Sequence, residues 1–142
     1  MGLRIDTSAN AEICRHAEAG YPHEVVGILA GSAAEGRVSR VMALHNERAD
    51  SPANRYQVSG LAVMRGESSL EAAGLDILGY YHSHPDHPST YSDYDRDHAL
   101  PNRSYVIVSV VSARVATTQS WRLREDRSAM DEEPLVLEAP CP

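Results

Sequence analysis

The chain has 142 residues, of which 42% are hydrophobic and 23% are charged, and these proportions exclude an intrinsically disordered protein. Its formal net charge is -7 and it contains no basic segment, so we expect no nucleic-acid partner. The N-terminus lacks the apolar stretch of a signal peptide, and no segment approaches the roughly 18 consecutive apolar residues that span a membrane.

The N-terminal half of the chain predicts a helix followed by strands. Capping residues precede a segment in which apolar residues recur at helical spacing, which predicts a helix over Ser8–Gly20. The apolar run from Glu24 to Gly31 predicts a short buried strand with one acid at its start. Two further strands and a helix are predicted over residues 37–47, 56–58 and 60–73, in that order.

The C-terminal half is richer in strand signals. An apolar run from Leu75 leads into His82 and His84, and Pro85 ends this predicted strand because proline has no N–H to donate. A polar loop separates it from a short predicted helix over Ser92–Leu100. The remaining predicted strands are 104–111, 116–124 and an edge strand at 135–137, and the acids from about residue 126 predict a solvated, proline-containing tail.

These elements predict an α/β (α+β) fold with a mixed sheet of about six strands flanked by helices. The length suits a single domain over residues 1–142. Two cysteines are too few for a disulfide framework, and Cys141 lies next to last between two prolines, far from Cys14. We therefore expect a reduced, soluble, cytoplasmic protein. No stretch specifies the oligomeric state, so a homodimer stays open.

Two histidines and one carboxylate are spaced so that they can meet. Residues i and i+2 of a strand point to the same face, so His82 and His84 can aim at one point. Residues i and i+3 of a helix are neighbours, so Ser92 and Asp95 lie together at the start of the next helix. Two histidines, one carboxylate and an open fourth position are the ligand set of a catalytic zinc site.

Such a site needs a base, and Glu24 is the leading candidate. It stands at the start of an apolar strand, where desolvation raises the affinity of a carboxylate for a proton. The hydroxyl of Ser92 could donate a hydrogen bond to the oxyanion that forms when water attacks a carbonyl. Zinc-activated water, a base and an oxyanion donor together predict amide hydrolysis.

The pattern resembles the JAMM motif of the JAMM/MPN+ (Mov34/MPN/PAD-1) metalloproteases. That motif has a distant Glu, then His-Ser/Thr-His-Pro, six residues, Ser, two residues and Asp. The chain matches it with Glu24, with the segment His82–Pro85 and with Ser92 and Asp95. The apolar, glycine-containing segment after Glu24 also looks like the family's strand, although Val26 stands where the family often has Cys.

The resemblance implies an MPN-like domain with a cytidine-deaminase-like layout. It implies that His82, His84 and Asp95 bind one Zn²⁺ per chain, that Glu24 is the general acid/base and that Ser92 stabilises the oxyanion. Members cleave peptide or isopeptide bonds after the C-terminal Gly-Gly of ubiquitin-like proteins. The short, stand-alone prokaryotic members look like processing enzymes for small ubiquitin-like sulfur carriers, which are therefore the expected partner and substrate.

Each part of the motif also has a simpler explanation. A histidine pair can pack in a strand, Ser-x-x-Asp is more often a helix cap, and a lone Glu at a strand end is usually exposed. The segment His82–His87 also matches the first half of the metallo-β-lactamase motif through Asp86 and His87, but that fold needs metal-binding histidines far downstream. We expect His87 and the other histidines to be surface or packing residues. An inactive MPN-type binding scaffold and a hydrolase of small-molecule amides stay as alternatives.

Overall fold

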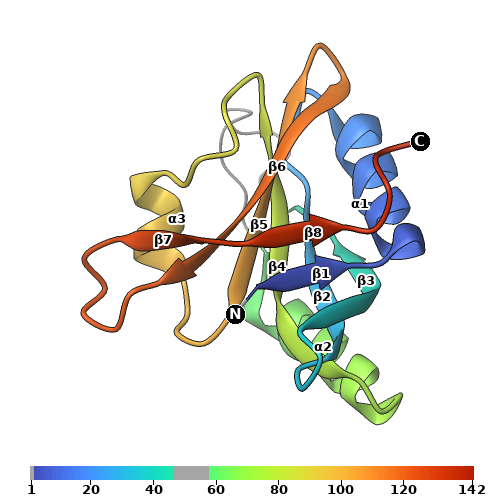
Figure 1. Ribbon diagram of the computed structural model, residues 1–142, viewed down its shortest axis with the longest axis vertical. Coiled ribbons are helices and arrows are strands. Elements are labelled where there is room, and N and C mark those ends of the chain that lie inside the picture. Colours follow the sequence, from blue (N-terminus) through green and yellow to red (C-terminus); the bar gives the residue numbers. More distant parts are fainter. Residues whose placement is uncertain (1, 47–57) are drawn as a thin grey trace.

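The computed structural model describes residues 2–46 and 58–142. Over these residues the chain forms eight strands and three helices, arranged as one sheet with helices packed against it (Figure 1). The elements in chain order are β1 (Leu3–Ile5), α1 (Thr7–Gly20), β2 (Val26–Ser32), β3 (Arg37–Leu44), α2 (Gly60–Ala72), β4 (Asp76–Pro85), α3 (Asp93–His98), β5 (Ser104–Val111), β6 (Arg114–Leu123), β7 (Met130–Glu133) and β8 (Leu135–Leu137).

The sheet is mixed and strongly curved. Its strand order is β7-β6-β5-β4-β2-β3-β1-β8, with parallel pairing of β4 to β5 and of β1 to both β3 and β8. The two strands at the ends of this order, β7 and β8, are separated in the chain by Pro134 alone. The sheet must therefore curl until its ends approach each other, and Figure 1 shows β7 running into β8 across the front of the molecule.

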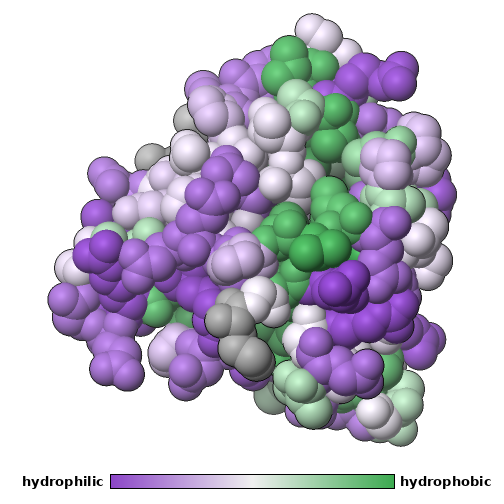
Figure 2. All heavy atoms as spheres, in the orientation of Figure 1, coloured by the Kyte–Doolittle hydropathy of each residue, from purple (hydrophilic) through white to green (hydrophobic). Residues whose placement is uncertain are grey.

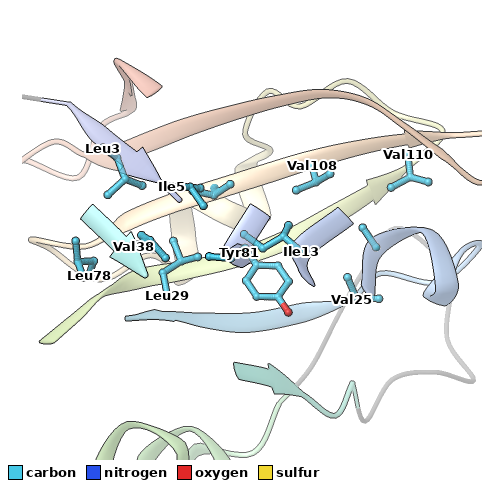
Figure 3. Packing of buried hydrophobic residues seen from close by; sticks show 13 residues of the cluster. Leu3, Ile5, Ile13, Val25, Leu29, Val38, Leu78, Tyr81, Val108 and Val110 are labelled. Carbon is cyan, nitrogen blue, oxygen red and sulfur yellow. The ribbon is translucent and has the colours of Figure 1, made fainter. Parts of the chain in front are cut away.

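The main hydrophobic core lies on the concave face of this sheet, against α1. It joins Ile5 of β1 to Val108 of β5, although β4, β2 and β3 lie between these strands, and Ile13 of α1 packs among them (Figure 3). Tyr81 of β4 is buried in the same core and lies across Gly27, where any side chain would collide with its ring. Because side chains alternate along a strand, Tyr81 facing α1 directs its neighbour His82 to the opposite face.

The fold class agrees with the prediction, but the described part of the chain forms a sheet of eight strands rather than about six. Sequence analysis missed β1 and β7 because each is very short and neither has a hydrophobic run of its own. The strand predicted over residues 56–58 falls almost entirely outside the described residues. Among residues 2–46 and 58–142, no helix is long and apolar enough to cross a membrane.

The edge strand predicted at residues 135–137 is confirmed as β8, but the prediction of a solvated acidic tail from about residue 126 is wrong at Glu133 of β7. Glu133 is buried, and its Oε1 accepts hydrogen bonds from the hydroxyls of Ser104 at 2.7 Å and Ser120 at 2.8 Å. A buried carboxylate is tolerated when hydrogen bonds satisfy it, and these two partners belong to β5 and β6. Figure 2 shows apolar surface over β1 and β8, where Val136 is 46% exposed. A homodimer would need an apolar surface of this kind, and the homodimer itself stays a prediction.

The expectation of two reduced cysteines is also wrong. Cys14 of α1 and Cys141 form a disulfide across a sequence separation of 127 residues. Asn10, one turn earlier on α1, is buried and donates a hydrogen bond from Nδ2 to the carbonyl oxygen of Ala139 at 3.0 Å. The C-terminal segment is therefore bound to α1 by a disulfide and a hydrogen bond. The position of Cys141 near the chain end does not predict this contact.

Replacing Cys141, the less buried partner of this bridge, should destabilise the fold. For Cys141→Ala we expect a loss of about 2–5 kcal/mol in the free energy of unfolding, because the cross-link restricts the unfolded chain across nearly its whole length. Urea denaturation of the wild type and the variant without reductant measures the difference. Adding reductant should lower the midpoint of the wild type and leave that of Cys141→Ala unchanged; equal midpoints before reduction would show that the bridge contributes nothing.

Candidate active site

His82 and His84 are positioned by the most constrained strand of the sheet. β4 lies between β2 and β5, and His82 pairs with Val26 on one side and Ile107 on the other. His84 pairs with Ser109 of β5 near the end of the strand. Both imidazoles are almost fully buried. A strand that is hydrogen-bonded on both sides leaves its side chains little freedom, so the two rings have fixed directions.

Asp95 is oriented by the cap of α3. Ser92 is the N-cap residue, and its Oγ accepts a hydrogen bond from the Asp95 N–H at 3.1 Å. The Asp95 Oδ2 in turn accepts from the Ser92 N–H at 2.9 Å, which completes a capping box. The Ser-x-x-Asp spacing therefore both caps the helix and positions a predicted metal ligand. The same hydrogen bonds that start the helix also fix the direction of the carboxylate.

The three predicted metal ligands converge on one point. His82 Nε2 lies 3.1 Å from Asp95 Oδ1, His84 Nε2 lies 3.1 Å from Asp95 Oδ2, and the two Nε2 atoms are 3.2 Å apart. A tetrahedral ion with bonds of about 2.0–2.1 Å separates its ligand atoms by about 3.3 Å. Within the described parts of the chain, these residues form the group of His, Cys, Asp and Glu side chains that could hold a metal ion.

The charges at this point favour a cation. His84 Nδ1 lies 2.8 Å from the Pro88 carbonyl oxygen, which can only accept, so a neutral His84 keeps its proton on Nδ1 and presents a bare Nε2. Burial raises the pKa of Asp95, but the adjacent His82 and His84 outweigh it and hold this pKa well below its usual range. For His84 the directions are reversed. Burial lowers its pKa, but the neighbouring Asp95 more than offsets this effect, so the pKa of His84 is raised.

Glu24 is fastened to the histidine strand through its backbone. The Val25 N–H donates to the Ser83 Oγ at 2.9 Å, and the Ser83 N–H donates to the Val25 carbonyl at 3.0 Å. Asn46 holds the carbonyl of Glu24 itself through Nδ2 at 2.7 Å. Sequence analysis missed Asn46, which has no motif and no characteristic spacing. The Ser83 contact also gives a physical role to the central Ser of His82-Ser83-His84.

Glu24 and Ser92 line the same pocket as His84, one of the two predicted ligand histidines. The pocket has a volume of about 270 Å³ and is lined by Glu24, His84, His87, Pro88, Thr90, Tyr91 and Ser92. Glu24 is only 4% exposed. His87 was expected to be a surface or packing residue, and its position on this wall was not predicted. The Asp86 carboxylate instead accepts a hydrogen bond from the Tyr21 hydroxyl and is not in the converging group, which disfavours the metallo-β-lactamase arrangement.

Comparisons with known proteins found a family and curated relatives that the chain resembles. Residues 6–124 match the family described as prokaryotic homologs of the JAB domain. The chain is 32% identical over 112 residues to a desampylase of Haloferax volcanii, covering 75% of this chain and 80% of that protein. It is 37% identical over 93 residues to a probable TtuB-protein conjugate cleaving protease of Thermus thermophilus, covering 66% of this chain and 60% of that protein.

A solved structure supports the same fold. A JAB1/MPN domain protein from Archaeoglobus fulgidus superposes with a TM-score of 0.60 at 15% identity, and the superposition covers 96% of each chain. At this identity the likeness concerns the arrangement of helices and strands. The curved mixed sheet and its helices are therefore a known architecture, into which the converging histidines and aspartate are set.

Proposed function

The chain belongs to the prokaryotic homologs of the JAB domain, a stand-alone branch of the JAMM/MPN metalloproteases, and from this membership we propose its reaction. It hydrolyses the amide bond that follows the C-terminal Gly-Gly of a ubiquitin-like or sulfur-carrier protein. One Zn²⁺ per chain is held by His82, His84 and Asp95. The observation that carries the proposal is the convergence of these three ligand atoms beside the pocket that contains Glu24 and Ser92.

The residues of the pocket divide the reaction between them. A zinc ion, when bound, supplies Lewis acidity toward the amide carbonyl and toward water. Glu24 takes a proton from the attacking water and returns it to the leaving amine as general acid. Ser92 stabilises the oxyanion, and its cap geometry suits this role: its Oγ already accepts from Asp95, so its own O–H proton is available to donate.

The substrate class is supported by the relatives and by the shape of the pocket. One relative is named as a desampylase and another as a probable TtuB-protein conjugate cleaving protease, and the proposal takes cleavage of a small protein from its conjugate as the shared reaction. A pocket of about 270 Å³ suits a chain terminus without side chains better than a bulky sequence. A Gly-Gly terminus meets that requirement.

The proposal is tested with a ubiquitin-like carrier that has a short extension after its C-terminal Gly-Gly. Incubation with the zinc-loaded protein should release the intact carrier, which mass spectrometry identifies by its mass. A carrier with the last Gly replaced by Val serves as the matched control and should resist cleavage. Cleavage of small-molecule amides alone would favour the alternative hydrolase, and bound zinc with no cleavage of any amide would favour the binding scaffold.

Three further predictions accompany this function as proposals. Residues 1–142 form a single domain, the protein acts in the cytoplasm, and it needs neither nucleic acid nor a membrane for activity. Size-exclusion chromatography with light scattering would decide between a monomer and a homodimer.

A further inference from the structure

The loop between β4 and α3 controls which nitrogen of His84 can bind a metal. Its Pro88 carbonyl oxygen lies 2.8 Å from His84 Nδ1 and can act only as an acceptor. A neutral imidazole has one proton, so a proton held on Nδ1 leaves Nε2 bare and directed at Asp95. If Pro88 moved, His84 could turn or change tautomer. The position of one carbonyl oxygen is thus a condition for metal binding.

The next residue, Ser89, anchors this loop to β6. Ser89 is 1% exposed, and its hydroxyl donates to Gln119 Oε1 at 2.7 Å and lies 2.8 Å from the hydroxyl of Thr117. Its carbonyl oxygen accepts from Trp121 Nε1 at 2.9 Å. Thr117, Gln119 and Trp121 alternate along one strand and so lie on the same face. One loop residue is therefore bound by three side chains of β6.

Two more contacts hold the loop on either side of Ser89. The ring of Tyr91 packs edge to face against Trp121, with ring centroids 5.2 Å apart. On the other side, the Ser109 hydroxyl donates to the His87 carbonyl at 2.6 Å. Pro88 lies between these fixed points, so the anchor on β6 determines where its carbonyl oxygen points.

We propose that Ser89 and Trp121 are positioning residues for the metal centre. They hold the Pro88 carbonyl against His84 Nδ1 and thereby keep His84 Nε2 directed at the metal. Neither residue contacts the ligand atoms, and neither belongs to the motif that the sequence displays. The inference rests on the proposed metal site but concerns a separate question, namely how the site is kept in its binding geometry.

The test uses two variants and metal binding rather than turnover. Ser89→Ala removes the hydroxyl bonds to β6, and Trp121→Phe removes the indole N–H while keeping a ring against Tyr91. Chelator competition should show zinc affinity about tenfold to a hundredfold weaker in Ser89→Ala, the usual cost of losing a partner behind a ligand, and a smaller loss in Trp121→Phe. Cobalt loaded in place of zinc should give an altered visible absorption spectrum in both variants.

Two controls separate positioning from general destabilisation. Thr118→Ala changes the same strand on its opposite face, and Cys141→Ala weakens the fold far from the loop; both should bind zinc as the wild type does. Unchanged zinc affinity and cobalt spectrum in Ser89→Ala and Trp121→Phe would overturn the inference. So would an equal loss of affinity in the control variants. A wild type that binds no zinc would instead overturn the proposed function itself.

Discussion

Glu24→Gln should lower turnover by about two to four orders of magnitude and leave the bound zinc unchanged, because a general base is lost and no ligand is. Gln has nearly the size of Glu, so the buried position stays filled. The backbone there is held by Asn46 and by the Ser83–Val25 bonds, none of which uses the Glu24 side chain. An amide cannot take a proton from water, so the change removes the proton transfer while keeping the architecture of the pocket.

The rate at which Glu24→Gln cleaves the extended carrier tests the predicted loss of turnover. Its metal content, measured by mass spectrometry, tests the predicted retention of zinc. Glu12→Gln is the matched control, since Glu12 is an exposed acid of α1 and should tolerate the change with full turnover. Loss of zinc from Glu24→Gln would make Glu24 a ligand rather than a base. Retained turnover would remove Glu24 from the reaction.

Asp95→Asn should lower zinc affinity by more than about a hundredfold. About a hundredfold is the largest usual loss when a residue that only hydrogen-bonds to a metal ligand is replaced, and Asp95 is proposed as a ligand itself. Asp95 supplies the single negative charge of the converging group, and each of its oxygens faces one histidine. An amide keeps an oxygen that can accept from the Ser92 N–H, so the capping box can persist while the charge is lost. The variant therefore isolates ligand charge from helix stability.

Asp93→Asn provides the comparison for this second variant. Asp93 lies in the same first turn of α3, but its side chain is 90% exposed and forms an ion pair with Arg96 at 3.4 Å, and the change should leave zinc affinity as it is. Chelator competition measures both variants, and circular dichroism checks that each is folded. Wild-type affinity in Asp95→Asn would exclude Asp95 from the ligand set and leave two histidines, which are too few for the proposed centre.

The local parts of the site could be predicted from sequence because their geometry follows from backbone periodicity. Alternation in a strand places His82 and His84 on one face, and one helical turn places Ser92 beside Asp95. Both relations hold in the structure. The fold class could be predicted for the same reason, since hydrophobic period distinguishes strands from helices wherever the segment is long enough to show it.

Other features depend on contacts between segments that are distant in the sequence. They are the order of the strands, the burial of Glu133, the Cys14–Cys141 bridge and the hydrogen bond from Asn46 to the Glu24 carbonyl. The anchor of Ser89 on Trp121 is of the same kind. The sequence by itself determined which residues could bind a metal and which neighbours share a face. Only the tertiary structure decided what holds those residues in place, because a partner far along the chain leaves no periodic signal and is selected by the curvature and pairing of the whole sheet.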